Sequence, residues 1–345
     1  MKRALGPVLG VCAVLGCVAP AAASGGGRIG LAYGTGGERG QPRIVIANAN
    51  GGHRRTLAAG GVPAVAPNGS AVAFGTESGK VAVDVYSAAG KLIGHYFNGR
   101  RVEAGPIVWS SDSRYLAVGL TDVDATTRIG ESGLAIIDTV TGRATTIAHG
   151  QLEGVTWGPT SDTLVYGLAK STSQVGPSNL YVSTPTGSSM AQLTTNDHSV
   201  DPLWGALGIT YVQFKNRGHG DAPAYQLWLM NAKAQSRQIT HTRPGPLVEG
   251  LVPIAVSANG QRLIAGFQGE DTDNTFTVNL LTHAVHQIRV GKQIVTPWGI
   301  SRDGKRLLVD VGGFENDDNA GEIESVPFAG GKPTVLEQHG DYPSW

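Results

Sequence analysis

The sequence predicts an all-β fold, a β-propeller of seven four-stranded blades, on the strength of three observations. The chain holds 50 glycines among 345 residues, about twice the usual share, and short aliphatic runs occur along its whole length. A pattern of paired strands recurs every 44 to 52 residues. The chain also begins and ends with a partial copy of the repeat, and the two partial copies together make one complete copy.

Glycine at this frequency is also typical of collagen and of low-complexity chains. The sequence has no Gly-X-Y period and only 18 prolines, which excludes collagen. The recurring aliphatic runs offer enough apolar surface to form a large core, which argues against disorder. An ordered fold with many tight turns is the interpretation that remains.

The first element of each repeat is a pair of strands around a polar turn. We anchor each copy on the residue before the turn, and these anchors are Val65, Trp109, Trp157, Trp204, Val256, Ile300 and Trp345. Their spacing suits a propeller blade whose loops differ in length. An apolar residue repeated at one blade position predicts packing between blades rather than a carbohydrate platform.

The second element is an eight-residue segment that reads as a third strand running into a turn. It occurs seven times, and five copies end in glycine, at residues 44–51, 83–90, 135–142, 180–187, 227–234, 276–283 and 323–330. Six blades would follow if one copy were an irregular insertion. The sevenfold occurrence of both elements favours seven.

A glycine also recurs at one equivalent place inside the second strand, ten residues after the anchor in the four glycine-bearing repeats that have an anchor before them. It is present in five repeats, and Val212 and Asp310 replace it in the other two; the glycines are Gly34, Gly75, Gly119, Gly167 and Gly266. Glycine weakens a strand, so its recurrence predicts close approach by a neighbour, which we expect to be the adjacent blade.

The ends of the chain predict how the ring closes. Residues 28–34 match a second strand that has no first strand before it, and Trp345 ends a first strand with no second strand after it. We therefore expect the C-terminal strand to pair with the N-terminal strands in one blade, which removes the free edges of the sheet. Residues 28–345 would form a single propeller domain.

The N-terminus predicts export. A basic start and an apolar stretch precede Ala21–Ala23, so residues 1–23 have the pattern of a signal peptide, and residues 24–27 form a short linker. A second interpretation remains open, because residues 14–17 also resemble a bacterial lipobox. Residues 1–16 would then be a lipoprotein signal and Cys17 the lipidated residue, leaving the protein at the cell envelope rather than free in the periplasm or outside the cell.

Charge and cysteine content narrow the function classes. The 27 basic and 27 acidic residues balance, and no basic face or polybasic segment is evident, so we expect neither nucleic-acid binding nor membrane contact other than through a lipid anchor. Both cysteines, Cys12 and Cys17, lie in the leader. The mature chain is therefore expected to lack disulfides, thiol catalysis and cysteine-bound metal.

Several repeat segments resemble those of TolB-type β-propellers: WSSDSRYLAVG (109–119), SRDGKRLLVDV (301–311), LYVSTPTG (180–187) and the terminal YPSW (342–345). The resemblance extends over residues 28–345 and implies the propeller fold. It also implies an exported or envelope protein, since the namesake binds partner proteins in the periplasm. The chain departs from the namesake in having seven repeats rather than six and no segment for an N-terminal α/β domain. No Gly-x-Ser-x-Gly elbow is present, which excludes the related propeller peptidases.

Variation in loop length points to one face as the binding face. Second-to-third loops range from 7 to 15 residues, whereas the first-to-second turns are short and uniform. Binding residues are usually carried by variable loops on a rigid scaffold.

Four polar residues on this face form the candidate site. His198 and Asp201 precede the Trp204 anchor, and His219 and Asp221 lie in the long loop of the same blade. Their convergence would create a metal or acid–base site. The alternative is that they are ordinary hydrogen-bonded loop residues.

Clustered acids in other loops of this face suggest calcium or another divalent metal, although none has the spacing of a twelve-residue calcium loop. We favour solvated loop acids for these residues, which are Asp122, Asp124, Asp271, Asp273, Asp317 and Asp318.

The sequence therefore favours an exported, non-catalytic propeller without a cofactor, which binds a protein or an envelope polymer through its long-loop face. The alternative is a propeller-type hydrolase or lyase, active on lactones or glycans, with a metal or acid–base site at the mouth.

Overall fold

The computed structural model describes residues 27–36, 42–76, 81–100, 102–122, 132–169, 177–215, 223–243, 248–269, 274–291, 295–312 and 321–345. In these residues the regular structure consists of 28 β-strands. None of the described segments forms a helix long and apolar enough to cross a membrane.

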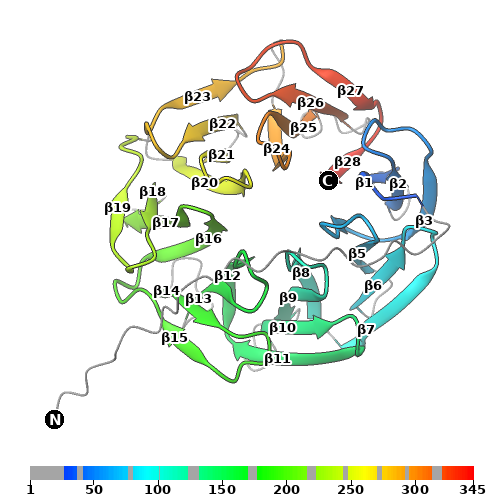
Figure 1. Cartoon of the computed structure of the whole chain (residues 1–345), viewed down its shortest axis with the longest axis horizontal. Coiled ribbons are helices and arrows are strands. Elements are labelled where there is room, and N and C mark those ends of the chain that lie inside the picture. Colours follow the sequence, from blue (N-terminus) through cyan, green and yellow to red (C-terminus); the bar gives the residue numbers. More distant parts are fainter. Residues whose placement is uncertain are drawn as a thin grey trace.

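The strands form a ring of seven four-stranded antiparallel blades, as the repeat predicted (Figure 1). The alternative of six blades is excluded.

Blade 1 contains β28 (Asp341–Ser344), β1 (Leu31–Thr35), β2 (Arg43–Ala47) and β3 (Arg55–Ala59). Blade 2 contains β4 (Ala64–Val65), β5 (Ala71–Thr76), β6 (Val81–Ser87) and β7 (Leu92–Arg100). Blade 3 contains β8 (Val102–Trp109), β9 (Tyr115–Asp122), β10 (Gly133–Asp138) and β11 (Arg143–His149).

The remaining four blades follow the same order from the inner strand outward. Blade 4 contains β12 (Gln151–Trp157), β13 (Leu164–Ala169), β14 (Ser178–Ser183) and β15 (Met190–Gln192). Blade 5 contains β16 (Ser199–Gly205), β17 (Gly208–Lys215), β18 (Ala224–Met230) and β19 (Ser236–Gln238). Blade 6 contains β20 (Val248–Val256), β21 (Arg262–Gly269), β22 (Asn274–Asn279) and β23 (Val285–Ile288). Blade 7 contains β24 (Val295–Ile300), β25 (Arg306–Val311), β26 (Glu322–Pro327) and β27 (Thr334–Glu337).

The ring closes in blade 1, where the C-terminal strand β28 lies innermost beside β1 (Figure 1). Ala32 pairs with Ser344 and Gly34 with Asp341. The closing strand also contacts the next blade, because the Val65 amide donates a 3.0 Å hydrogen bond to the Ser344 hydroxyl. The predicted closure is confirmed.

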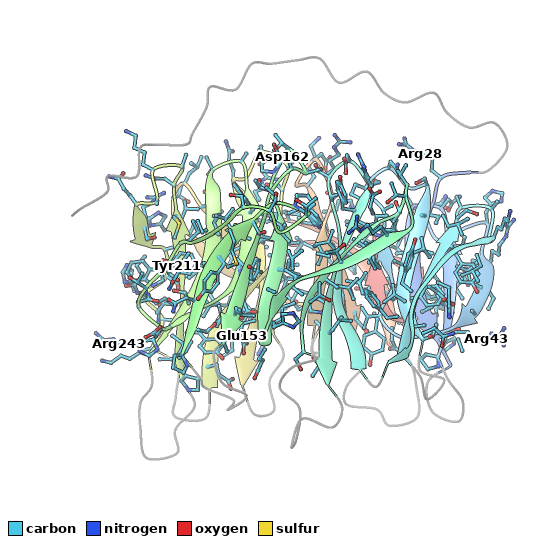
Figure 2. All side chains as sticks on the ribbon, turned by 90° about the horizontal axis from the view of Figure 1, so that it is seen from below. Arg28, Arg43, Glu153, Asp162, Tyr211 and Arg243 are labelled. Atoms are coloured by element: carbon cyan, nitrogen blue, oxygen red, sulfur yellow. The ribbon has the colours of Figure 1, made fainter. Side chains whose placement is uncertain are left out.

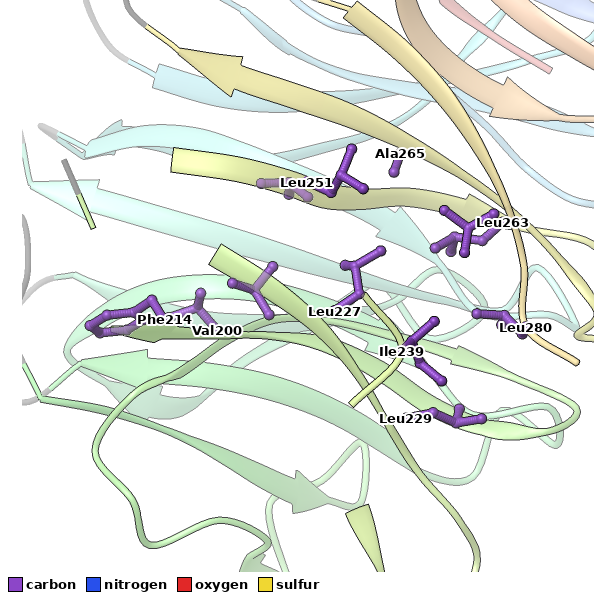
Figure 3. Close-up of a cluster of buried hydrophobic side chains, with 12 residues drawn as sticks. Val200, Phe214, Leu227, Leu229, Ile239, Leu251, Leu263, Ala265 and Leu280 are labelled. Carbon is purple, nitrogen blue, oxygen red and sulfur yellow. The ribbon is translucent and has the colours of Figure 1, made fainter. Parts of the chain in front are cut away.

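The core consists of apolar layers between neighbouring blades. The second and third strands are buried on both faces, which explains why their sequences are continuous aliphatic runs rather than alternating ones. Figure 3 shows the layer between blades 5 and 6, to which β17, β18 and β21 contribute Val212, Leu227 and Leu263, all fully buried. Truncating a leucine in such a layer typically costs ~2–5 kcal/mol.

Two of the tryptophan anchors join their blade to the one before it. The Trp109 Nε1–H donates to the carbonyl oxygen of Ala64, and the Trp157 Nε1–H to that of Val108, both at 2.9 Å. Both rings are at least 93% buried. The predicted role of these two anchors in packing between blades is confirmed.

The recurring second-strand glycines have a different cause from the one expected at two positions. A Cβ on Gly119 would lie 2.4 Å from the carbonyl oxygen of Gly105, and a Cβ on Gly167 would lie 2.2 Å from that of Glu153. Gly105 and Glu153 belong to the inner strand of the same blade. The expectation of an adjacent blade is therefore wrong here, because a bulge in the inner strand, not the neighbouring blade, occupies the space.

Candidate functional site

The two ends of the ring differ in what they carry. We call the end where inner strands begin and second strands finish the loop face, and the opposite end the hairpin face. Glu153 and Arg243 lie toward the loop face, whereas Asp162 and Arg28 lie toward the hairpin face (Figure 2).

Acidic residues occupy bulges at the start of three consecutive inner strands on the loop face. The pairing register shifts between Leu152 and Val155 in β12, between Val200 and Leu203 in β16, and next to Val248 in β20. The residues in these bulges include Glu153, Asp201 and Glu249. A bulge redirects side chains at the rim of a sheet, and here it does so at equivalent places in blades 4, 5 and 6.

The charges of all three carboxylates act on one tyrosine, and we call Glu153, Asp201, Glu249 and Tyr225 the carboxylate arc. Burial and the negative charges of all three acids raise the pKa of the Tyr225 hydroxyl, which therefore stays protonated and able to donate a hydrogen bond. All four side chains remain partly exposed. The arc is thus accessible from the loop face.

Asp201 has the largest pKa shift among the three acids of the arc. Burial among protein atoms, followed by the negative charge of Glu153, raises the pKa of Asp201 to about 7. Burial also raises the pKa of Glu153, against the opposing effect of a hydrogen bond with Gln151. Asp201 has a φ of 50°, a left-handed conformation that is uncommon for a residue other than glycine.

No counter-charge accompanies the arc within the part of the chain that the structure describes. The ion pairs found there join Arg54 to Glu337, His95 to Asp84, Arg114 to Asp138 and Lys305 to Asp303. None of them includes an arc residue. The arc is therefore an acidic site that a cation from outside could neutralise.

The four predicted site residues have different outcomes. Asp201 lies in the arc beside Glu153, whereas the exposed His198 packs edge-on against the Phe214 ring at a centroid distance of 5.0 Å. His219 and Asp221 lie outside the described residues, so their convergence with the other two stays a prediction. The described residues contain no group of three or more His, Cys, Asp or Glu side chains arranged to hold a metal ion.

The clustered loop acids, which we expected to be solvated rather than bound to calcium, lie in or beside segments that the structure does not describe. Asp122 is the last residue of β9, and Asp124, Asp271, Asp273, Asp317 and Asp318 fall outside the described ranges.

Sequence reasoning missed Glu153, Glu249 and Tyr225. The two glutamates each precede a glycine, and Asp201 precedes Pro202, at the start of an inner strand. An acid followed by glycine or proline at this blade position was the available signal. Tyr225 lies on the third strand of blade 5, and nothing in its sequence context marks it as part of the mouth.

A second pair of carboxyls lies where blade 7 meets blade 1. Asp310 is 4% exposed, and its Oδ1 atom is buried without a hydrogen-bond partner. Burial, followed by the negative charge of Asp341, raises the pKa of Asp310 to about 7. The sequence did contain a signal, since Asp310 stands where five other blades have glycine.

Comparison with known proteins identifies the fold class. No protein-family model matches the chain, and no curated protein matches it in sequence. Among solved structures, TolB from Acinetobacter baumannii is 12% identical, with 88% of this chain and 78% of that chain covered and a TM-score of 0.54. The β-propeller domain of the Trilobed protease from Pyrococcus furiosus is 13% identical, with 91% and 94% covered and a TM-score of 0.64. An oligogalacturonate lyase in complex with manganese is 14% identical, with 89% and 85% covered and a TM-score of 0.58.

The protein therefore has a TolB-like β-propeller fold, as the repeat segments indicated. At these identities the likeness concerns the fold alone. Its structural neighbours include TolB, the propeller domain of a protease and a lyase, so function has to be argued from the site.

Proposed function

We propose that the protein is an exported, non-catalytic propeller that binds a partner protein by accepting a basic segment of it at the carboxylate arc. The observation that carries this proposal is that the charges of Glu153, Asp201 and Glu249, in equivalent bulges of three neighbouring blades, act on Tyr225, while none of the ion pairs among the described residues includes them. The leader of residues 1–23, with the alternative lipidation of Cys17, supports export.

The charge of the arc favours one of the two kinds of ligand that the sequence left open. Carboxylates attract lysine and arginine side chains, and each charge-assisted hydrogen bond contributes ~1.5–3 kcal/mol. An anionic envelope polymer would be repelled by the same groups. A protein segment with lysines or arginines therefore suits the arc better than such a polymer.

The test is a charge-neutralised triple variant, Glu153→Gln with Asp201→Asn and Glu249→Gln. The matched control neutralises three exposed acids of the hairpin turns, Asp112→Asn, Asp162→Asn and Asp303→Asn, so both variants lose three negative charges. The probe is a fluorescent twelve-residue peptide of Arg, Gly and Ser, titrated by fluorescence anisotropy at low salt, with a Glu, Gly and Ser peptide as the opposite-charge control.

We expect the wild type and the hairpin-face variant to bind the basic peptide and the arc variant to bind at least tenfold more weakly. Binding should strengthen as the pH rises through about 7, because Asp201 becomes ionised, and should weaken with added salt. Equal affinity of the two triple variants would refute binding at the arc. Mass spectrometry of the mature N-terminus tests export separately, since it distinguishes a chain beginning at Ser24 from one beginning at a lipidated Cys17.

One observation favours a second candidate, an acid–base hydrolase or lyase at the same mouth. A carboxyl with a pKa of about 7 beside another carboxyl can donate and accept protons near neutral pH. Turnover in a screen of lactones, glycans and peptides that Asp201→Asn abolishes, while binding of the basic peptide persists, would favour the enzyme over the binding protein.

A further inference from the structure

The junction between blades 7 and 1 contains a buried acid without a matching charge. Asp310 lies near the end of β25, is 4% exposed, and has an Oδ1 atom with no hydrogen-bond partner. A buried polar group in this state is rare, and an ionised carboxylate there is strongly disfavoured. The side chain therefore requires either a proton or a neutralising group.

The strand register shows what faces Asp310 from its own blade. Asp310 pairs with Thr296 of β24 and with Ile323 of β26, and Ile323 pairs with Glu337 of β27, so these side chains share the face turned to blade 1. Glu322 and Glu324 flank Ile323 in β26 and alternate to the opposite face.

Blade 1 supplies the groups on the other side of the junction. The Asp341 carboxylate at the start of β28 accepts a 3.2 Å hydrogen bond from the Gly321 amide. The Tyr33 hydroxyl donates to Glu337 Oε2 at 2.6 Å, and Arg54 pairs with the same oxygen at 2.8 Å. Among the described residues, the cation of this junction, Arg54, is engaged by Glu337, and no ion pair includes Asp310 or Asp341.

We propose that Asp310 holds a proton beside Asp341 at the closing junction, and that loss of this proton to solvent loosens the closing strand β28. Two carboxyls in a buried site cannot both ionise without repulsion, so the protonated pair holds the junction together. Deprotonation leaves two negative charges between blade 7 and the strand that completes blade 1. The device acts at the one blade whose strands come from both ends of the chain.

The expected dependence on pH follows from the direction of the shifts. Burial and the charge of Asp341 raise the pKa of Asp310 to about 7, and burial also raises the pKa of Asp341. The folded protein then holds more protons than the unfolded chain between the ordinary aspartate pKa near ~4 and about 7. Stability from this pair is complete below that window, falls as the pH rises through it, and is lost above it.

The test compares urea unfolding and hydrogen–deuterium exchange of β28 at pH 5, 6, 7 and 8. The variants are Asp310→Asn, Asp341→Asn and the exposed control Asp162→Asn, with exchange corrected by an unstructured peptide of the same sequence as β28. In the wild type and the control we expect the urea midpoint to fall, and corrected exchange of residues 341–345 to rise about tenfold or more, between pH 5 and pH 8. In Asp310→Asn the rise in exchange of residues 341–345 should largely be lost, and the urea midpoint should fall less than in the wild type; the fall that remains comes from Asp201 and Glu153, whose pKa values burial also raises.

Three outcomes would overturn the proposal. One is a pH dependence of Asp310→Asn equal to that of the wild type. Another is a wild-type rise in exchange that is no greater in β28 than in the strands of blades 3 to 5. The third is that CaCl2 or MnCl2 raises the urea midpoint of the wild type at pH 8 but not that of Asp310→Asn. A bound cation, rather than a proton, would then neutralise the pair. If Asp310→Asn does not fold, Asp341→Asn decides: the midpoint should depend less steeply on pH than in the wild type, and an unchanged profile refutes the pair.

Discussion

The aspartates of this protein show that the surroundings of a carboxyl, not its residue type, set its charge. Arg114 donates two hydrogen bonds to Asp138, at 3.3 and 2.8 Å, and lowers the pKa of that carboxyl to about 2. Asp201 has no such partner among the described residues, and burial raises its pKa to about 7. The sequence does not distinguish the two aspartates. The partner of Asp138, Arg114, lies just before another strand, and Asp201 has no such partner among the described residues.

Gly167 is the residue on which the position of Glu153 depends. A Cβ at Gly167 would lie 2.2 Å from the Glu153 carbonyl oxygen, so Gly167→Ala must displace the bulge that carries the carboxylate. We expect a loss of ~2–4 kcal/mol in the free energy of unfolding, measured by urea denaturation, and weaker binding of the basic peptide.

Gly266 provides the matched control, since it occupies the same second-strand position in blade 6. Its Cβ would meet Pro297 at 3.5 Å and Ile254 at 3.9 Å, which are ordinary contacts. Gly266→Ala should therefore cost less than ~1 kcal/mol. Similar losses in the two variants would show that strand propensity, and not the bulge, requires glycine at this position.

Individual strands were the most predictable elements, and their irregularities were the least. The anchor and the eight-residue segment located the first three strands of each blade because burial on both faces imposes an aliphatic run. The bulges at Glu153, Asp201 and Glu249 were not predicted, since a bulge arises from how two backbones pair rather than from one strand's composition. The second-strand glycine signalled a close contact but not its partner.

The closing strand β28 is the element on which the ring depends most directly. Removing residues 341–345 deletes the inner strand of blade 1, leaves the edge of β1 unpaired and removes the hydrogen bond from Val65 to Ser344. We expect a midpoint lowered by at least ~2 M urea, or an unfolded chain, together with self-association through the open edge. Urea denaturation and size-exclusion chromatography measure both effects.

A synthetic peptide of residues 337–345 added to the truncated chain supplies the control for this deletion. The native peptide should restore the midpoint as its concentration rises, because it binds only the folded ring. A scrambled peptide of the same composition should not. A truncated chain as stable as the full one would show that β28 is dispensable for closure.

At the scale of the whole molecule, the ring brings together residues that no local pattern connects. Glu153, Asp201 and Glu249 are separated from one another by nearly fifty residues in the sequence. They lie on the same face of three neighbouring blades because every inner strand begins at the same end of the ring. The repeat therefore predicted which face would carry the site. It did not predict which side chains would converge there, because that depends on the bulges and on the charges of neighbouring blades.

A circular permutant tests whether blade 1 is equivalent to the other six. Gly75, Gly119, Gly167 and Gly266 each lie ten residues after the anchor of their blade. Joining Trp345 directly to Gly25 would place Gly34 ten residues after the anchor Trp345. New ends between Val140 and Thr141 would open a hairpin tip in blade 3 where Val140 is 76% exposed.

Covalent linkage of β28 to β1 in this permutant lowers the entropic cost of closing the ring, whereas opening an exposed turn costs little. The urea midpoint of the permutant should therefore equal or exceed that of the wild type. The permutant should also remain monomeric and unfold in one transition. A lower midpoint, with β11 exchanging freely while β28 stays protected, would show that the outer hairpin of blade 3 contributes more to ring stability than the split of blade 1 removes.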